Sequence, residues 1–247
     1  MPSATAADLH SLLRKRGLES SIPVPDAGRP QPAPTGFAAL DALLGGGWPR
    51  GEISECLGGL SSGCTTVALC TLAQATAGGQ LAAYVDASDG LDPGSAERAG
   101  VSLDSLLWVR CGGRHKGNLE RPARRTSRSA QAWKAAHLIA SAGGFGLIVL
   151  DLLGLPPAEL RGLQRLPWLG LRQAIAHSPA TILTLSSQHL TGSAGALALS
   201  FRREKPRWRG DSGVSLRLAG LSMRVTILHQ RRSIRGQAGA CNLEAER

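Results

Sequence analysis

Residues 58–66 carry the clearest chemistry in the sequence, a glycine-rich turn that reads GGLSSGCTT. Its spacing is that of the phosphate-binding loop G-x-x-x-x-G-K-[ST], which joins a strand to a helix. In such a loop the glycines let backbone N–H groups wrap phosphate oxygens, and the start of the helix adds its positive dipole end. The flanking residues predict that context, with a strand over 52–57 and a helix that opens at Thr65. We therefore expect a degenerate nucleotide-binding site that includes Gly58, Gly63, Cys64, Thr65 and Thr66.

The loop departs from the motif at the position of the lysine, which is Cys64. A neutral thiol cannot neutralise the β- and γ-phosphates, and no adjacent residue is cationic. Taken alone, the turn is also compatible with a chance glycine-rich connection. That alternative weakens because residues 147–151 form an apolar segment ending in Asp151, where such folds hold magnesium. Weak binding of ATP and magnesium through the backbone, Thr65 and Asp151 stays open. A reactive Cys64 thiol is a lesser alternative, since no base or resolving cysteine is near in sequence.

Short apolar segments alternate with helical ones after residue 50, a pattern typical of a mainly parallel sheet. Strands are expected over residues 52–57, 81–86, 106–110, 147–151 and 181–186, with 214–218 and 223–228 as a terminal pair. Helices are expected from Thr65, over 129–142, and over 158–177 with an interruption at Pro167. The predicted fold class is α/β, with a mainly parallel central sheet flanked by helices.

Two stretches of sequence carry a family resemblance. PTGFAALDALLGGGWPRGEISECLGGLSSGCTT, residues 34–66, resembles the start of the RecA ATPase core. YVDASDGLDP, residues 84–93, resembles the RecA segment that carries the catalytic glutamate, whose position falls on Ser88. The resemblance implies a RecA-like P-loop core over residues 35–232, with Gln188 near the nucleotide-sensing glutamine. The hydroxyl of Ser88, in place of that glutamate, has no basicity to activate water at neutral pH. With both Cys64 and Ser88 in place of the usual groups, we expect no catalytic residues and no ATP hydrolysis.

The phrase GGWPRG at residues 46–51 and the short chain resemble the ImuA group of the RecA superfamily, which includes SulA-like proteins. That resemblance implies an accessory protein of the SOS response, DNA repair and translesion synthesis that binds RecA and the polymerase-like protein ImuB. Two alternatives stay open. One is a residual ATPase or nucleotide switch that takes a cation in trans, with Arg50 and the arginines near Arg125 as donors. The other is a SulA-like regulator that blocks another protein through its N-terminal helix.

Positive charge is concentrated in two stretches of a chain whose formal net charge is +10. Residues 110–134 hold eight basic residues and one acid, and residues 201–247 hold eleven and four. Guanidinium groups bind phosphate bidentately and stack on flat rings, so we expect contact with single-stranded or damaged DNA. The candidate DNA-binding residues are Arg202, Arg203, Lys205, Arg207, Trp208, Arg209, Arg124, Arg125 and Arg128. For residues 121–128, a solvated loop or a protein-docking surface is the alternative.

The segments that correspond to the single-strand-binding loops of RecA, by the same resemblance, are residues 154–172 and 189–198. Their basic residues are Arg161, Arg165 and Arg172. The basic charge lies elsewhere in the chain, so we do not expect this protein to bind DNA in the helical manner of RecA.

The two ends of the chain are expected to lie outside the core. Residues 1–19 predict a short helix in which Leu9, Leu12 and Leu13 share one side, either docking on a partner or folding back. Residues 20–34 hold five prolines and predict a linker, and residues 233–247 predict a flexible basic tail.

Several protein classes are excluded by composition. No apolar run is long enough to span a bilayer, and the N-terminus lacks the apolar stretch of a signal peptide. Five cysteines, an odd number without a C-x-x-C pair, argue against a disulfide scaffold and a zinc ribbon. The six histidines show no metal-ligand spacing. We expect a cytoplasmic, nucleoid-associated protein without a metal site, and leave self-association open.

Overall fold

The computed structural model describes residues 30–111, 127–210, 217–231 and 239–246. The chain divides into two units, Met1–Pro30 and Gln31–Arg247, and every described helix and strand lies in the second. The expected N-terminal helix with Leu9, Leu12 and Leu13 falls outside the described residues, as do Arg124 and Arg125.

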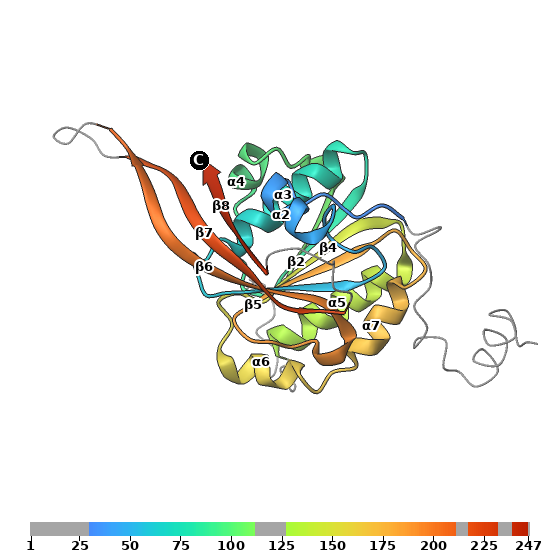
Figure 1. Cartoon of the computed structure of the whole chain (residues 1–247). Helices are drawn as coiled ribbons and strands as arrows, with labels where there is room; N and C mark the ends of the chain where they lie inside the picture. Colours follow the sequence, from blue (N-terminus) through green and yellow to red (C-terminus); the bar gives the residue numbers. More distant parts are fainter. Residues whose placement is uncertain (1–29, 112–126, 211–216, 232–238, 247) are drawn as a thin grey trace, which may run out of the picture. The chain divides into compact units, whose positions relative to one another are not determined.

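One sheet of eight strands organises the second unit, in the order β3-β2-β4-β5-β1-β6-β7-β8. Strands β1 to β6 run parallel to one another, and β7 pairs antiparallel with β6 and with β8. The bounds are β1 Ile53–Leu57, β2 Leu81–Asp86, β3 Leu106–Arg110, β4 Phe145–Asp151, β5 Thr181–Ser186, β6 Gly195–Arg209, β7 Arg217–Gln230 and β8 Ala240–Glu246. The α/β class with a mainly parallel sheet is confirmed (Figure 1).

Helices pack on both faces of this sheet, which explains why its strands are apolar on both sides (Figure 1). One buried cluster joins Leu40 of α2 and Leu72 of α3 to the strands, and the other joins Ile139, Leu160 and Leu171 of α5, α6 and α7. The bounds are α2 Ala38–Leu44, α3 Cys64–Ala77, α4 Pro93–Arg98, α5 Arg128–Ala142, α6 Pro157–Leu163 and α7 Trp168–Ile175, with 3-10 turns at Leu103–Ser105 and Gly192–Ala194. The expected interruption at Pro167 separates α6 from α7. Among the helices that the structure describes, none is long and apolar enough to cross a bilayer.

The C-terminal strands differ from the expected terminal pair. Instead of separate strands over 214–218 and 223–228, β7 is a single strand of 14 residues whose main partner is β6. Residues 201–209, part of the basic stretch for which no strand was expected, form the second half of β6. The expected flexible end is also wrong for β8, which pairs with β7 over seven residues. These strands are held because Met223 and Val225 of β7 and Leu243 of β8 are buried with α2 and α3. Arg224, between the first two, obscures the alternation of buried and exposed residues in the sequence.

Strand β6 continues past the end of β1 as one side of an antiparallel ribbon. The pairing of β1 with β6 ends at Ser200, so residues 201–209 pair with β7 alone. We call residues 201–209 and 217–225 the β6–β7 ribbon. Figure 1 shows its two strands extending together beyond the helices.

Met223 is fully buried in the cluster formed with α2 and α3. We expect Met223→Ala to lower the free energy of unfolding by about 2–5 kcal/mol, because it deletes buried methylene groups and leaves a cavity. Urea unfolding followed by circular dichroism measures this loss. The control is Leu228→Ala on the same strand, where the side chain is 59% exposed and the expected loss is below about 1 kcal/mol. Equal losses from the two variants would contradict the packing of β7.

Candidate phosphate-loop site

The glycine-rich turn joins β1 to α3, as the sequence predicts. Gly63 is the N-cap of α3 and has a φ of 101°, a left-handed conformation that favours glycine. A Cβ on Gly63 would lie 2.3 Å from Sδ of Met223, and one on Gly58 would lie 2.3 Å from Oγ of Ser62. The two glycines therefore let the loop pack closely against β7 and against itself.

Cys64 lies beneath this loop, with a side chain only 1% exposed. Its Sγ accepts a hydrogen bond from Oγ of Ser62 at 3.2 Å. Burial raises the pKa of the Cys64 thiol to about 11, although the Ser62 hydrogen bond opposes that rise. The thiol is therefore neutral at pH 7, which also argues against the reactive-thiol alternative. The next residues, Thr65 and Thr66, are half-buried at the start of α3.

Asp151, at the end of β4, is satisfied by groups of the protein itself. Its Oδ2 accepts a hydrogen bond from the Tyr84 hydroxyl at 2.5 Å, and its Oδ1 accepts one from the Leu153 amide at 2.9 Å. Burial raises the pKa of Asp151 to about 6, against the effect of both hydrogen bonds. Tyr84 is the only tyrosine in the chain and is fully buried in β2. Sequence reasoning missed it, although a lone phenol in an otherwise apolar strand was a usable signal.

Ser88 is fixed in the loop that follows β2. Its Oγ donates a hydrogen bond to the Leu153 carbonyl at 2.7 Å, so its proton points at the loop after β4. The fully buried Asp86 accepts hydrogen bonds from three amides of this loop, those of Ser88, Gly90 and Leu91. The neighbouring carboxylate, Asp89, pairs with Arg110 at 2.5 Å. Both the hydroxyl and the adjacent carboxylate therefore have partners within the protein.

These groups do not fit a magnesium nucleotide bound as phosphate-loop enzymes bind it. That mode needs oxygen ligands open to the ion and a cation on the phosphates. Here the Asp151 carboxylate is directed at Tyr84 and Leu153, and Cys64 contributes no charge. What the loop retains is a backbone turn that is exposed at Gly59 and Ser61.

Glu55, which the sequence analysis did not single out, holds the connection between β5 and β6. Its side chain is fully buried in β1, and Oε1 accepts hydrogen bonds from the amides of Leu190 and Thr191 at 2.9 and 3.1 Å. Oε2 lies 2.5 Å from Nδ1 of His189. The carbonyl of Gln188 accepts a short hydrogen bond from Ser186. This connection is thus a compact turn, and it leads directly into the 3-10 turn Gly192–Ala194 and β6.

The basic candidates fall on separate elements. Arg202, Arg203 and Lys205 are exposed along β6, and Arg209 ends that strand. Arg207 pairs with Glu244 of β8, and the Trp208 side chain is 58% exposed. Arg128 instead opens α5, where it lies 3.4 Å from Glu159. The structure therefore brings the candidates of residues 202–209 together on one strand and leaves Arg128 apart from them.

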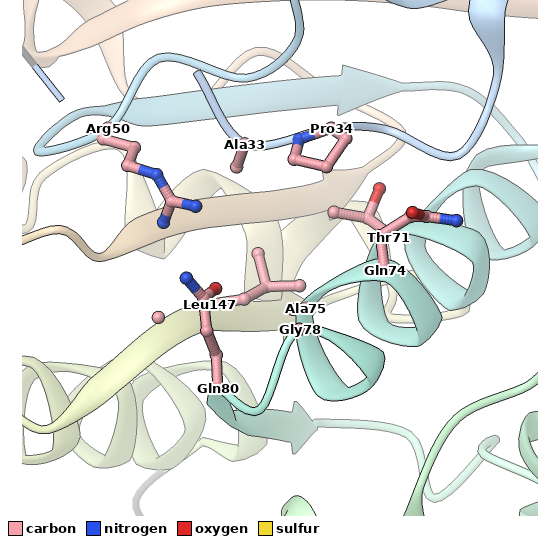
Figure 2. Close-up of a pocket in the computed structure, with 10 residues that line it drawn as sticks. Ala33, Pro34, Arg50, Thr71, Gln74, Ala75, Gly78, Gln80 and Leu147 are labelled. Carbon is pink, nitrogen blue, oxygen red and sulfur yellow. The ribbon is translucent and has the colours of Figure 1, made fainter. Parts of the chain in front are cut away.

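Arg50 lies at the opposite end of the sheet from the phosphate loop. Its Nε donates to the Gln31 carbonyl at 2.9 Å and its Nη1 to the Pro179 carbonyl at 2.7 Å. It lines a cavity of about 150 Å³ together with residues of α3 and the starts of β2 and β4 (Figure 2). Figure 2 shows Gln80 and Leu147 beside it, at the amino-terminal end of the strands. Arg50 is therefore remote from the phosphate loop of its own chain.

Comparisons with known proteins agree with this architecture. The family model for the RecA N-terminal domain matches residues 19–121. Protein RecA of Methylococcus capsulatus is 42% identical over 132 residues, which cover 52% of this chain and 34% of that protein. Protein RecA of Mycobacterium tuberculosis is 40% identical over 132 residues, 52% of this chain and 15% of that protein. Protein RecA of Mycobacterium leprae is 34% identical over 202 residues, 78% of this chain and 24% of that protein.

These matches support a RecA-like superfamily for the chain, and the sheet and its helices are consistent with a RecA-like core. The matched region spans about a third or less of the length of these relatives.

The raised pKa of Asp151 predicts a specific dependence of stability on pH. Between about pH 4 and pH 6 the folded chain keeps a proton on Asp151 that the unfolded chain has lost, so this stabilisation fades as pH rises through 6. Asp151→Asn abolishes the titration and should raise stability relative to the original chain by up to about 3 kcal/mol between pH 4 and pH 7. Urea unfolding across that range measures the difference. The exposed Asp104→Asn serves as the control, and a difference for Asp151→Asn that is independent of pH would contradict the assignment.

Proposed function

We propose that this chain is a RecA-like accessory protein of SOS-induced translesion DNA synthesis that does not hydrolyse ATP. In this role it belongs to the ImuA group and binds RecA, an ImuB-type polymerase homologue, or both, on single-stranded or damaged DNA. Its place is the cytoplasm, in association with the nucleoid.

The state of the phosphate-loop site supports the absence of hydrolysis. Phosphoryl transfer needs charge stabilisation on the phosphates and a group that orients the attacking water. Cys64 is buried and neutral where the cation is needed, and Ser88 donates its proton to the Leu153 carbonyl. Asp151 is held by Tyr84. The cation on the phosphates, the group that orients water and the free carboxylate are thus all missing from the described residues of the site. This observation carries the proposal.

Sequence similarity supports the choice of partners. The matched relatives are RecA proteins, which favours a role beside RecA and DNA. The phrase GGWPRG at residues 46–51 and the replacements at Cys64 and Ser88 favour the ImuA group within the superfamily. The compact turn held by Glu55, where a DNA-binding loop would lie by resemblance, favours an accessory role over that of a recombinase.

A nucleotide switch that borrows a cation in trans is the second candidate, favoured by the exposed backbone at Gly59 and Ser61. Arg50 is poorly suited to supply that cation to another subunit. It would have to release two carbonyl groups to which it already donates hydrogen bonds.

An ATPase assay on the purified full chain separates the two candidates. We expect no turnover above background, with or without single-stranded DNA, because the charge and the water-orienting group are both replaced. Asp151→Asn should give the same background rate as the original chain. Turnover that disappears in Asp151→Asn would refute the accessory proposal and favour the switch.

The partners can be tested by affinity capture of the tagged full chain from cells with damaged DNA. We expect recovery of RecA and of a polymerase homologue, and loss of both when the DNA-damage response is not induced. Recovery of cell-division proteins in their place would contradict the translesion role and indicate a SulA-like regulator.

A further inference from the structure

The β6–β7 ribbon carries many like charges on its two strands. Its residues 201–209 and 217–225 include seven arginines and lysines and one acid, Glu204. Arg202, Arg203 and Lys205 are exposed, and the structure gives them no ion pair within the described ranges. The ribbon therefore carries uncompensated positive charge along β6.

The register of the ribbon increases this repulsion. Arg202 lies directly opposite Arg224. Like charges opposite one another destabilise an antiparallel pair. Glu204 relieves one member of this pair, because it lies 2.9 Å from Arg224. Such an arrangement is costly in the free protein, and a bound polyanion would relieve it.

Trp208 adds an apolar element to the charged surface. Its side chain is 58% exposed, although tryptophan side chains are highly buried on average. In the register of the two strands Trp208 pairs with Leu218. The preceding residue, Arg207, forms an ion pair with Glu244. An exposed indole among arginines is suited to stacking on an unpaired base, because every base has a π-face. In a duplex the bases are already stacked on one another and are not available to it.

The root of the ribbon is fixed by packing. Arg203 pairs in register with Met223, and Met223 is fully buried against Gly63 of the phosphate loop. The contact between Met223 and Gly63 is apolar and forms within the protein without any ligand. The charged surface is therefore positioned without any nucleotide.

We infer that the β6–β7 ribbon binds single-stranded DNA, with Arg202, Arg203 and Lys205 on the phosphates and Trp208 stacked on a base, independently of ATP. This inference deepens the proposed function and rests on it for the choice of DNA over another polyanion. The occupant is single-stranded because the ribbon offers phosphate contacts and a stacking platform together.

The test is fluorescence anisotropy of the full chain with a labelled oligothymidylate. Arg202→Gln, Arg203→Gln and Lys205→Gln combined should weaken binding at least about tenfold and make the salt slope shallower by about 2. The matched control removes three exposed charges elsewhere, with Lys134→Gln, Arg161→Gln and Arg165→Gln combined, and should change affinity less than about twofold. Equal losses from the two triple variants would overturn the ribbon as the binding element. Circular dichroism establishes that all variants are folded.

Two further arms test the kind of ligand. Trp208→Ala should weaken oligothymidylate binding about tenfold and leave the weaker binding of a duplex unchanged. A duplex that binds more tightly than the oligothymidylate would overturn the assignment to single-stranded DNA. So would polyglutamate, if at equal charge it displaces the oligothymidylate from the protein.

A separate measurement tests independence from nucleotide. Magnesium ATP should leave the affinity for the oligothymidylate unchanged, and a requirement for ATP would overturn that independence. None of these results depends on hydrolysis or on partner capture, so failure of the ribbon is distinguishable from failure of the proposed function.

Discussion

The phosphate loop of this protein is held by contacts within the chain, and this constraint governs the rest of the site. A glycine turn at a helix N-terminus presents backbone donors that suit a phosphate. Here Gly63 of the same turn packs against Met223, and the Ser62 hydroxyl donates a hydrogen bond to the Cys64 thiol. At the end of β4, Tyr84 occupies one oxygen of the Asp151 carboxyl. A buried polar group needs a partner, and each of these groups has one without a ligand.

Packing at the loop also couples the site to the C-terminal strands. Met223 lies at the centre of this connection, because it is buried against the phosphate loop and paired with Arg203 of the ribbon. The core at the α2 and α3 face therefore supports both the candidate phosphate loop and the basic surface. The candidate phosphate loop and the ribbon proposed to bind DNA are therefore adjacent parts of one sheet.

The sequence predicted the parts of the fold whose signals are local. The apolar strands from β1 to β5 and the break at Pro167 follow from periodicity and from proline geometry. Strands β6 and β8 were missed and the extent of β7 was underestimated, because charged residues interrupt the apolar pattern there, as Arg224 does between the buried Met223 and Val225. Cys64 could be identified from the spacing of the loop, and Ser88 from the resemblance of residues 84–93 to the RecA segment. Their partners could not, because Tyr84 and Met223 meet the site only through tertiary packing.

The most direct test of the central claim is calorimetric titration of the full chain with ATP, in magnesium and in EDTA. If Asp151 is committed to Tyr84 and Leu153, the metal has no carboxylate to join, and any weak heat of binding should be the same in both buffers. Tight binding that requires magnesium and disappears in Asp151→Asn would contradict the account.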